Sequence, residues 1–128
     1  MMDPIEALAD AIMTFEGWRL GTRSWRNRNP GNLRPFKEIG QPADRDGYRI
    51  FDSLSEGFLA LKMDLNTKFY HNSHNLTLQS TLLDLLNIYA PAGDNNNPTE
   101  YTRFVCKWTS AILQREIKPE TTLKEYLG

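Results

Sequence analysis

The sequence predicts a mainly helical α+β domain with one small β-hairpin after the first helix. Apolar residues recur every three or four positions over four long segments, which is the period of an amphipathic helix. Capping residues stand in front of these segments, where they can accept hydrogen bonds from free backbone N–H groups. Only two short stretches, 33–36 and 48–51, have extended character, and the polar segment between them contains Gly40, Pro42 and Asp46-Gly47.

Length and composition fit one globular domain over residues 1–128. The chain has 128 residues, 40% of them hydrophobic and 11% aromatic, and no segment is long and apolar enough to span a membrane. We expect no signal peptide, because the first helix carries Asp3, Glu6 and Asp10, so synthesis in a reducing cytoplasm is the expectation. Cys106 has no possible disulfide partner in the chain and is predicted to be a core residue.

The first helix is predicted to begin after Asp3 and to end near Gly17. Asp3 can cap it, Pro4 suits the first turn, and Glu6 can reach back to the cap. Its apolar stripe consists of Ile5, Leu8, Ala9, Ile12 and Phe15.

Glu16 stands on or beside that stripe, at the C-terminal end of the helix. It follows Ile12 by one helical turn, so the spacing predicts partial burial. Desolvation and the negative end of the helix dipole both favour a protonated carboxyl group. A carboxylic acid in that state can protonate a leaving oxygen in glycoside cleavage. The alternative is a Glu16 that bends outward into water.

A basic segment follows the first helix, without an acidic residue between Gly17 and Lys37. Trp18 and Trp25 alternate with its cationic residues, which are Arg19, Arg23, Arg26, Arg28, Arg34 and Lys37. Such a segment can bind single-stranded nucleic acid or an acidic polymer such as a peptide-substituted glycan, or it can be a solvated loop with arginines paired elsewhere. The net charge of −1 argues against a protein devoted wholly to nucleic acid.

The rest of the chain predicts an ordered loop over 18–29 and four further helices. The second helix begins after Ser53 in a capping box and buries Leu54, Phe58, Leu61, Leu65 and Phe69. The third begins near Leu78, stops before Pro91, and buries Leu82, Leu85, Leu86 and Tyr89. The fourth begins after Asn97 and buries Tyr101, Phe104, Val105, Trp108 and Ile112. A short terminal helix lies around Leu123, Tyr126 and Leu127. His71 and His74 lack a third metal ligand nearby and are interpreted as loop residues.

The order of several motifs resembles the lysozyme-like superfamily. Glu16-Gly17 resembles the glutamate-glycine of phage lysozymes, and with Trp18, Asn32-Leu33 and the segment 48–53 it is similar to bacterial cell-wall glucosaminidases. Tyr89-Ala90-Pro91 followed by Tyr101 resembles the tyrosine motifs of soluble lytic transglycosylases. The segment 28–34, together with Asp94-Asn95-Asn96, resembles phage-encoded lysozyme-like virion or lysis proteins.

The chain also departs from these patterns. Phage lysozymes have an aspartate in the loop after the acid, where this chain has no carboxylate. Transglycosylases have serine and glutamine where this chain has Gly17 and Arg34.

The resemblance implies a peptidoglycan-cleaving glycosidase, muramidase or lytic transglycosylase, that acts on the cell wall after lysis or from a virion. Glu16 would be the general acid, Tyr89 and Tyr101 would line the cleft, and Asn32 and Arg34 would position the glycan. A second catalytic carboxylate would have to come from Glu38, Asp44, Asp46 or Asp52. Without one, Glu16 would act first as acid and then as base, assisted by the substrate's acetamido group.

We expect a monomer without metal or organic cofactor, whose partner is peptidoglycan. Two other classes of function remain as alternatives. One is a non-catalytic lysozyme-fold virion or secretion component that binds the wall, and the other, weaker, is a nucleic-acid-binding module that uses the arginine-rich loop.

Overall fold

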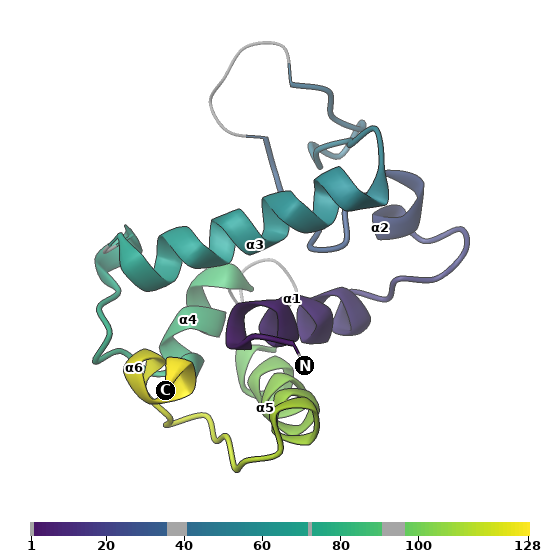
Figure 1. Cartoon of the computed structure of the whole chain (residues 1–128). Coiled ribbons are helices and arrows are strands. Elements are labelled where there is room, and N and C mark those ends of the chain that lie inside the picture. The colour runs from purple at the N-terminus through teal and green to yellow at the C-terminus, as the bar shows by residue number, and fades with distance from the viewer. Residues whose placement is uncertain (1, 36–40, 72, 91–96) are drawn as a thin grey trace.

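The computed structural model describes residues 2–35, 41–71, 73–90 and 97–128, and it is mainly helical, as predicted (Figure 1). The helices in chain order are α1 (Pro4–Phe15), α2 (Arg23–Arg26), α3 (Leu54–Tyr70), the 3-10 turn η1 (Ser73–Asn75), α4 (Leu82–Tyr89), α5 (Pro98–Leu113) and α6 (Leu123–Leu127).

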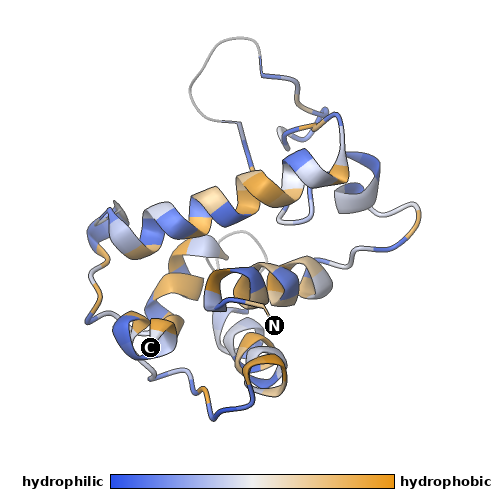
Figure 2. Ribbon diagram, viewed as in Figure 1, coloured by the Kyte–Doolittle hydropathy of each residue, from blue (hydrophilic) through white to orange (hydrophobic). Residues whose placement is uncertain are grey.

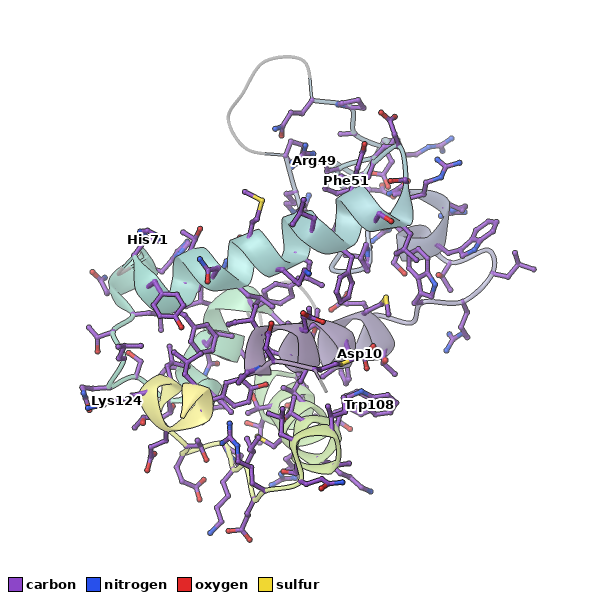
Figure 3. The ribbon with its side chains drawn as sticks, in the orientation of Figure 1. Asp10, Arg49, Phe51, His71, Trp108 and Lys124 are labelled. Atoms are coloured by element: carbon purple, nitrogen blue, oxygen red, sulfur yellow. The ribbon has the colours of Figure 1, made fainter. Side chains whose placement is uncertain are left out.

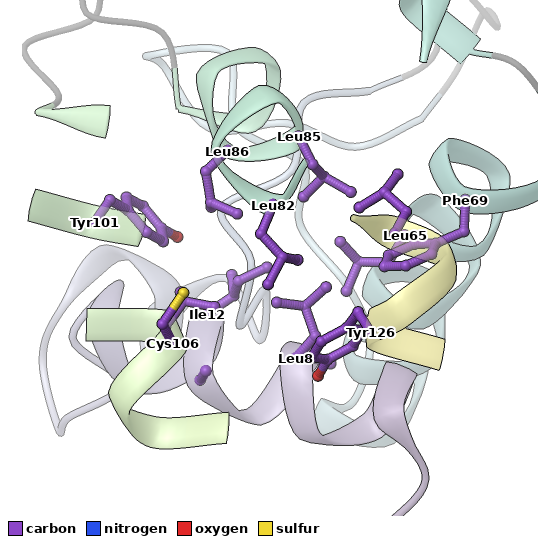
Figure 4. Close-up of a cluster of buried hydrophobic side chains, with 14 of the residues drawn as sticks. Leu8, Ile12, Leu65, Phe69, Leu82, Leu85, Leu86, Tyr101, Cys106 and Tyr126 are labelled. Carbon is purple, nitrogen blue, oxygen red and sulfur yellow. The ribbon is translucent and has the colours of Figure 1, made fainter. Parts of the chain in front are cut away.

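Helix α1 is central to the packing, since it contacts α3, α5 and α6. Its buried residues include Ala7, Ala9 and Ala11, whose small side chains let neighbouring helices approach closely. Leu8 and Ile12 project into one core cluster with side chains from α3, α4, α5 and α6 (Figure 4). Along α3, hydrophilic and hydrophobic residues alternate, so one side joins the core while the other stays accessible (Figure 2).

The predicted N-terminal capping residues of α1, α3 and α5 are confirmed, but the reciprocal bond of the capping box predicted at Ser53 is not formed among the described residues. The Asp3 carboxylate accepts the Glu6 N–H at 2.9 Å, and the Ser53 hydroxyl oxygen accepts the Glu56 N–H at 3.2 Å. Asn97 Oδ1 accepts the Glu100 N–H at 3.1 Å. Cys106 is buried, as predicted.

One helix was not predicted, and one predicted helix boundary was wrong. Residues 23–26, predicted as loop, form α2, which begins after Thr22 because the Thr22 hydroxyl oxygen accepts the Trp25 N–H. Helix α4 begins at Leu82 rather than near Leu78, because Thr81 and Asp84 form a reciprocal capping box at that point.

Three residues that were predicted to lie on buried apolar stripes are at the surface instead. Phe15 is 38% exposed because it is the last residue of α1. Leu54 is 41% exposed because it occupies the first position of α3, beyond the edge of the core. Trp108 is 37% exposed, and its indole N–H donates to Asp10 Oδ2 at 2.8 Å between α5 and α1 (Figure 3). A polar ring nitrogen with a surface acceptor explains that position.

The predicted β-hairpin is not formed by the described residues. The segment 42–50 is a turn closed by one isolated bridge between Ala43 and Arg49. The Arg49 N–H donates to the Leu33 carbonyl at 2.9 Å, as in a paired strand. The other backbone groups that a second strand would pair with are bound by the buried side chain of Asn29. Asn29 Nδ2 donates to the carbonyl oxygens of Leu33 and Arg49, each at 2.9 Å, and its Oδ1 accepts the Leu33 N–H at 2.9 Å. Phe36, the end of the first predicted strand, lies outside the described residues.

Candidate active site

Glu16 follows the last residue of α1 and is half-buried. Its backbone N–H completes the helix by donating to the Ile12 carbonyl at 2.8 Å, and Gly17 turns the chain away with φ +80°. A positive φ favours glycine, which explains the Glu-Gly sequence at this helix end. The carboxylate of Glu16 is fixed at both oxygens, since Asn32 Nδ2 donates to Oε1 at 2.9 Å and the Tyr101 hydroxyl donates to Oε2 at 2.7 Å.

Asn32 reaches Glu16 from a tight turn, in which its N–H donates to the Asn29 carbonyl at 3.0 Å. Its φ of +48° is left-handed, a conformation that asparagine tolerates better than most residues. The buried Oδ1 of Asn32 has no hydrogen-bond partner among the described residues. The amide therefore presents its donor to Glu16 and keeps an unused acceptor beside it.

Tyr101 comes from the first turns of α5 and is fully buried. Its ring packs against Phe15, with ring centroids 3.9 Å apart. Burial raises the pKa of Tyr101 well above its ordinary value, and the neighbouring Tyr89 and Glu16 add to this effect. Tyr101 is therefore a neutral donor at physiological pH.

Tyr89, the last residue of α4, fixes the turn that carries Asn32. Its hydroxyl donates to the Gly31 carbonyl at 2.6 Å. A Cβ atom on Gly31 would lie 2.4 Å from the Tyr89 hydroxyl oxygen and 2.7 Å from a Leu61 methyl carbon, so only glycine permits this close approach.

Glu16 lies on a cleft of about 840 Å³ that runs along the exposed side of α3. Four of the five predicted site residues line it, namely Glu16, Asn32, Arg34 and Tyr89. Tyr101, the fifth, was predicted to line the cleft, but the lining does not include it and its contact with the site is the bond to Glu16. Tyr101 lies 85 positions after Glu16 in the sequence, so no local pattern indicated that its hydroxyl group would bind Glu16 instead of facing the substrate.

The predicted candidates for a second carboxylate serve other purposes or lie elsewhere. Asp44 organises the turn: it accepts from Asn27 Nδ2 at 2.8 Å and from the Tyr48 N–H at 2.9 Å, and these bonds lower the pKa of Asp44. Asp46 pairs with Arg23 at 3.2 Å. Asp52 is exposed and does not line the cleft, and Glu38 lies outside the described residues.

Two other carboxylates, Glu56 and Asp64, do line the cleft, and sequence reasoning missed both. Asp64 forms an ion pair with Lys68 at 2.7 Å, one helical turn further along α3. The helical spacing from Asp64 to Lys68 beside the apolar stripe, with Glu56 on the opposite face, is the signal that could have identified this polar wall.

The described part of the chain contains no group of three or more His, Cys, Asp or Glu residues arranged to hold a metal ion. None of its helices combines the length and apolarity that a membrane crossing requires. Comparisons with protein-family models, curated proteins and solved structures give no match for this chain.

Proposed function

We propose that this chain is a peptidoglycan-cleaving glycosidase with a lysozyme-like arrangement, in which Glu16 is the general acid. The observation that carries the proposal is the setting of Glu16: a half-buried carboxyl group on the wall of a cleft, oriented by Asn32 and Tyr101. A positioned carboxyl group facing an open cleft is the central requirement of glycoside cleavage.

The chemistry would begin with transfer of the Glu16 proton to the glycosidic oxygen as the bond between that oxygen and the anomeric carbon breaks. The carboxylate that remains would be stabilised by its two donors, the Asn32 amide and the Tyr101 hydroxyl. These donors are already in place, so no reorganisation is needed when charge develops on Glu16.

In the second step Glu16 would act as base. It would take a proton from water, which gives hydrolysis, or from a hydroxyl group of the substrate itself, which gives an anhydro product. The substrate's acetamido group would stabilise the anomeric carbon between the steps. This route fits a site in which Asp44 and Asp46 are engaged in the turn.

The remaining cleft residues would bind the glycan. Arg34 is exposed on the cleft and can pair with a carboxylate. Tyr89 presents aromatic surface to the cleft, which suits contact with a sugar ring.

The binding-only alternative would be favoured by a Glu16 that hydrogen-bonds to a basic side chain and so stays ionised. The two hydrogen bonds described for Glu16 come instead from neutral groups, Asn32 and Tyr101.

Mass spectrometry of muropeptides released from purified sacculi tests the proposal. The wild-type protein should yield hydrolysed or anhydro ends, and Glu16→Gln should lower the rate by about 10²–10⁴-fold, the usual effect of losing a positioned acid. Glu120→Gln, an exposed position outside the cleft, is the matched control and should keep the wild-type rate. A Glu16→Gln protein with undiminished activity would redirect attention to Glu56 and Asp64. A wild type inactive on every wall tested would favour the binding-only function.

A further inference from the structure

Three arginines line one end of the cleft: Arg23 from α2, Arg34 from the chain after Asn32, and Arg49 from the chain before α3. We call these three residues the arginine cluster. Arg49 and its neighbour Phe51 lie beside the N-terminal half of α3 (Figure 3). The turn at 42–50 brings together side chains that are far apart in sequence, so the cluster is a product of the fold.

Aromatic rings hold the guanidinium groups in place. The Cζ atoms of Arg23 and Arg34 lie 4.2 Å and 4.3 Å from the centroid of the Tyr48 ring, and Arg49 Cζ lies 4.4 Å from that of Phe51. Stacking occupies a planar face of a guanidinium group and leaves the N–H donors at its edge available. The cluster is therefore oriented before any ligand binds.

The three arginines differ in how far the protein neutralises them. Arg23 forms an ion pair with Asp46 at 3.2 Å and a second, longer one with Asp44 at 4.0 Å. Arg34 donates to the backbone carbonyl of Asp46 at 3.1 Å.

Arg49 has no carboxylate within ion-pair distance among the described residues. The buried Nε atoms of Arg49 and Arg23 also lack hydrogen-bond partners within that part of the chain. A buried, charged donor without an acceptor is costly, so an incoming anion would relieve that cost.

We propose that the arginine cluster is a carboxylate-binding subsite, centred on Arg49, in the same cleft as Glu16. A carboxylate matches the forked donors of a guanidinium group, and such charge-assisted pairs are among the stronger hydrogen bonds. The inference rests on the proposed function and narrows its substrate: the cleft takes acidic saccharides in preference to neutral N-acetylglucosamine polymers. In peptidoglycan the carboxylate can belong to the lactyl ether of a muramic acid residue or to a stem peptide.

Isothermal titration separates these sources. The full chain carrying Glu16→Gln, which does not consume the ligand, is titrated with three tetrasaccharides. These are chitotetraose, a peptide-free tetrasaccharide of alternating N-acetylglucosamine and N-acetylmuramic acid, and the same saccharide with stem peptides. We expect the peptide-free acidic saccharide to bind about tenfold more tightly than chitotetraose, as one gained charge-assisted pair predicts. Tighter binding of only the peptide-bearing saccharide would assign the carboxylate to the stem.

Two arginine variants test whether the preference for the acidic saccharide depends on Arg49. Adding Arg49→Gln should abolish the preference for the acidic saccharide, whereas Arg103→Gln, an exposed arginine of α5 outside the cleft, should preserve it. Equal affinity for acidic and neutral saccharides overturns the subsite and leaves the glycan cleft standing. Absence of binding by all three contradicts the proposed function itself. Tighter binding of a single-stranded oligonucleotide than of any saccharide also overturns the proposal.

A second measurement needs no folded variant and no saccharide. In nitrogen-15 NMR spectra of the wild-type chain, sodium acetate should shift the Nε–H resonances of Arg49 and Arg23, the two donors without a hydrogen-bond partner among the described residues. Sodium chloride at equal ionic strength should not do so. Equal shifts from the two salts would show general screening and refute a carboxylate subsite.

Discussion

The hydroxyl group of Tyr101 donates to Glu16 Oε2 at 2.7 Å across 85 positions of sequence. This bond joins the first turns of α5 to the end of α1. The two helices pack against each other and form part of the core. The position of Glu16 on the cleft therefore depends on a helix that contributes no lining residue beside it.

Tyr101→Phe tests this support directly. The change keeps the ring against Phe15 and removes the donor, so folding should persist while cell-wall clearing falls about tenfold or more, as expected for a lost charge-stabilising donor. Tyr126→Phe is the matched control, because Tyr126 is also fully buried and donates to the Pro4 carbonyl at 2.7 Å, outside the cleft. Both variants should lose about 0.5–1.5 kcal/mol of unfolding free energy. Equal activity in the two would show that the Tyr101 bond has no catalytic role.

Asn32→Gly removes the side-chain amide that donates to Glu16 while it keeps the backbone conformation of the turn. Glycine tolerates the positive φ of this position, so the fold should be preserved while the donor to Glu16 Oε1 is lost. We expect lytic activity to fall about tenfold or more. Asn32→Ala should lose the same activity and some stability as well, because alanine is strained at that φ. Full activity in the glycine variant would remove Asn32 from the proposed site.

Gly57→Ala should reverse the usual effect of replacing a helical glycine. Alanine normally stabilises a helix interior by about 1 kcal/mol relative to glycine. At Gly57 in α3 a Cβ atom would lie 2.0 Å from the Arg28 carbonyl oxygen and 2.9 Å from Pro30 Cδ, so the variant should lose about 1–3 kcal/mol of unfolding free energy. Chemical denaturation measures the difference, with the exposed Ser55→Ala on the same helix as control. A stabilised Gly57→Ala protein would place α3 farther from the turn at 28–30.

Alkaline pH should destabilise the fold through its buried tyrosines. Tyr101 is protonated in both the folded and unfolded chain below about pH 10, the ordinary tyrosine pKa. Above that pH the unfolded chain releases the proton while burial keeps the folded pKa raised, so the unfolding free energy should fall by about 1.4 kcal/mol per pH unit for this group.

Denaturation series between pH 9 and 11.5 measure that slope. Tyr101→Phe should make this slope shallower than in the wild-type chain. The Cys106 thiol, whose pKa burial raises to about 11, acts in the same direction and is kept in every variant. An unchanged slope in Tyr101→Phe would contradict the burial of that hydroxyl group.

The sequence predicted those features that local chemistry controls. Asp3, Ser53 and Asn97 cap helices because each needs only a backbone N–H three residues ahead. The hairpin prediction was wrong because of a contact that the local sequence pattern does not show. The Asn29 side chain binds backbone groups of Leu33 and Arg49 that paired strands would otherwise use. Similarly, no local signal reveals that Tyr101 meets Glu16, because that contact arises from the packing of α1 on α5.

The bond from Tyr126 to the Pro4 carbonyl has a consequence for engineering. It spans 122 positions and holds α6 against the start of α1, so a short linker could join the two ends of the described chain. The loop around Leu20, whose side chain is 82% exposed, offers a place to open the chain instead. A circular permutant cut between Leu20 and Gly21 would be synthesised with Tyr101 ahead of Glu16. Comparing its refolding rate with that of the original chain would show whether the chain order of α1 and α5 affects how the two helices associate.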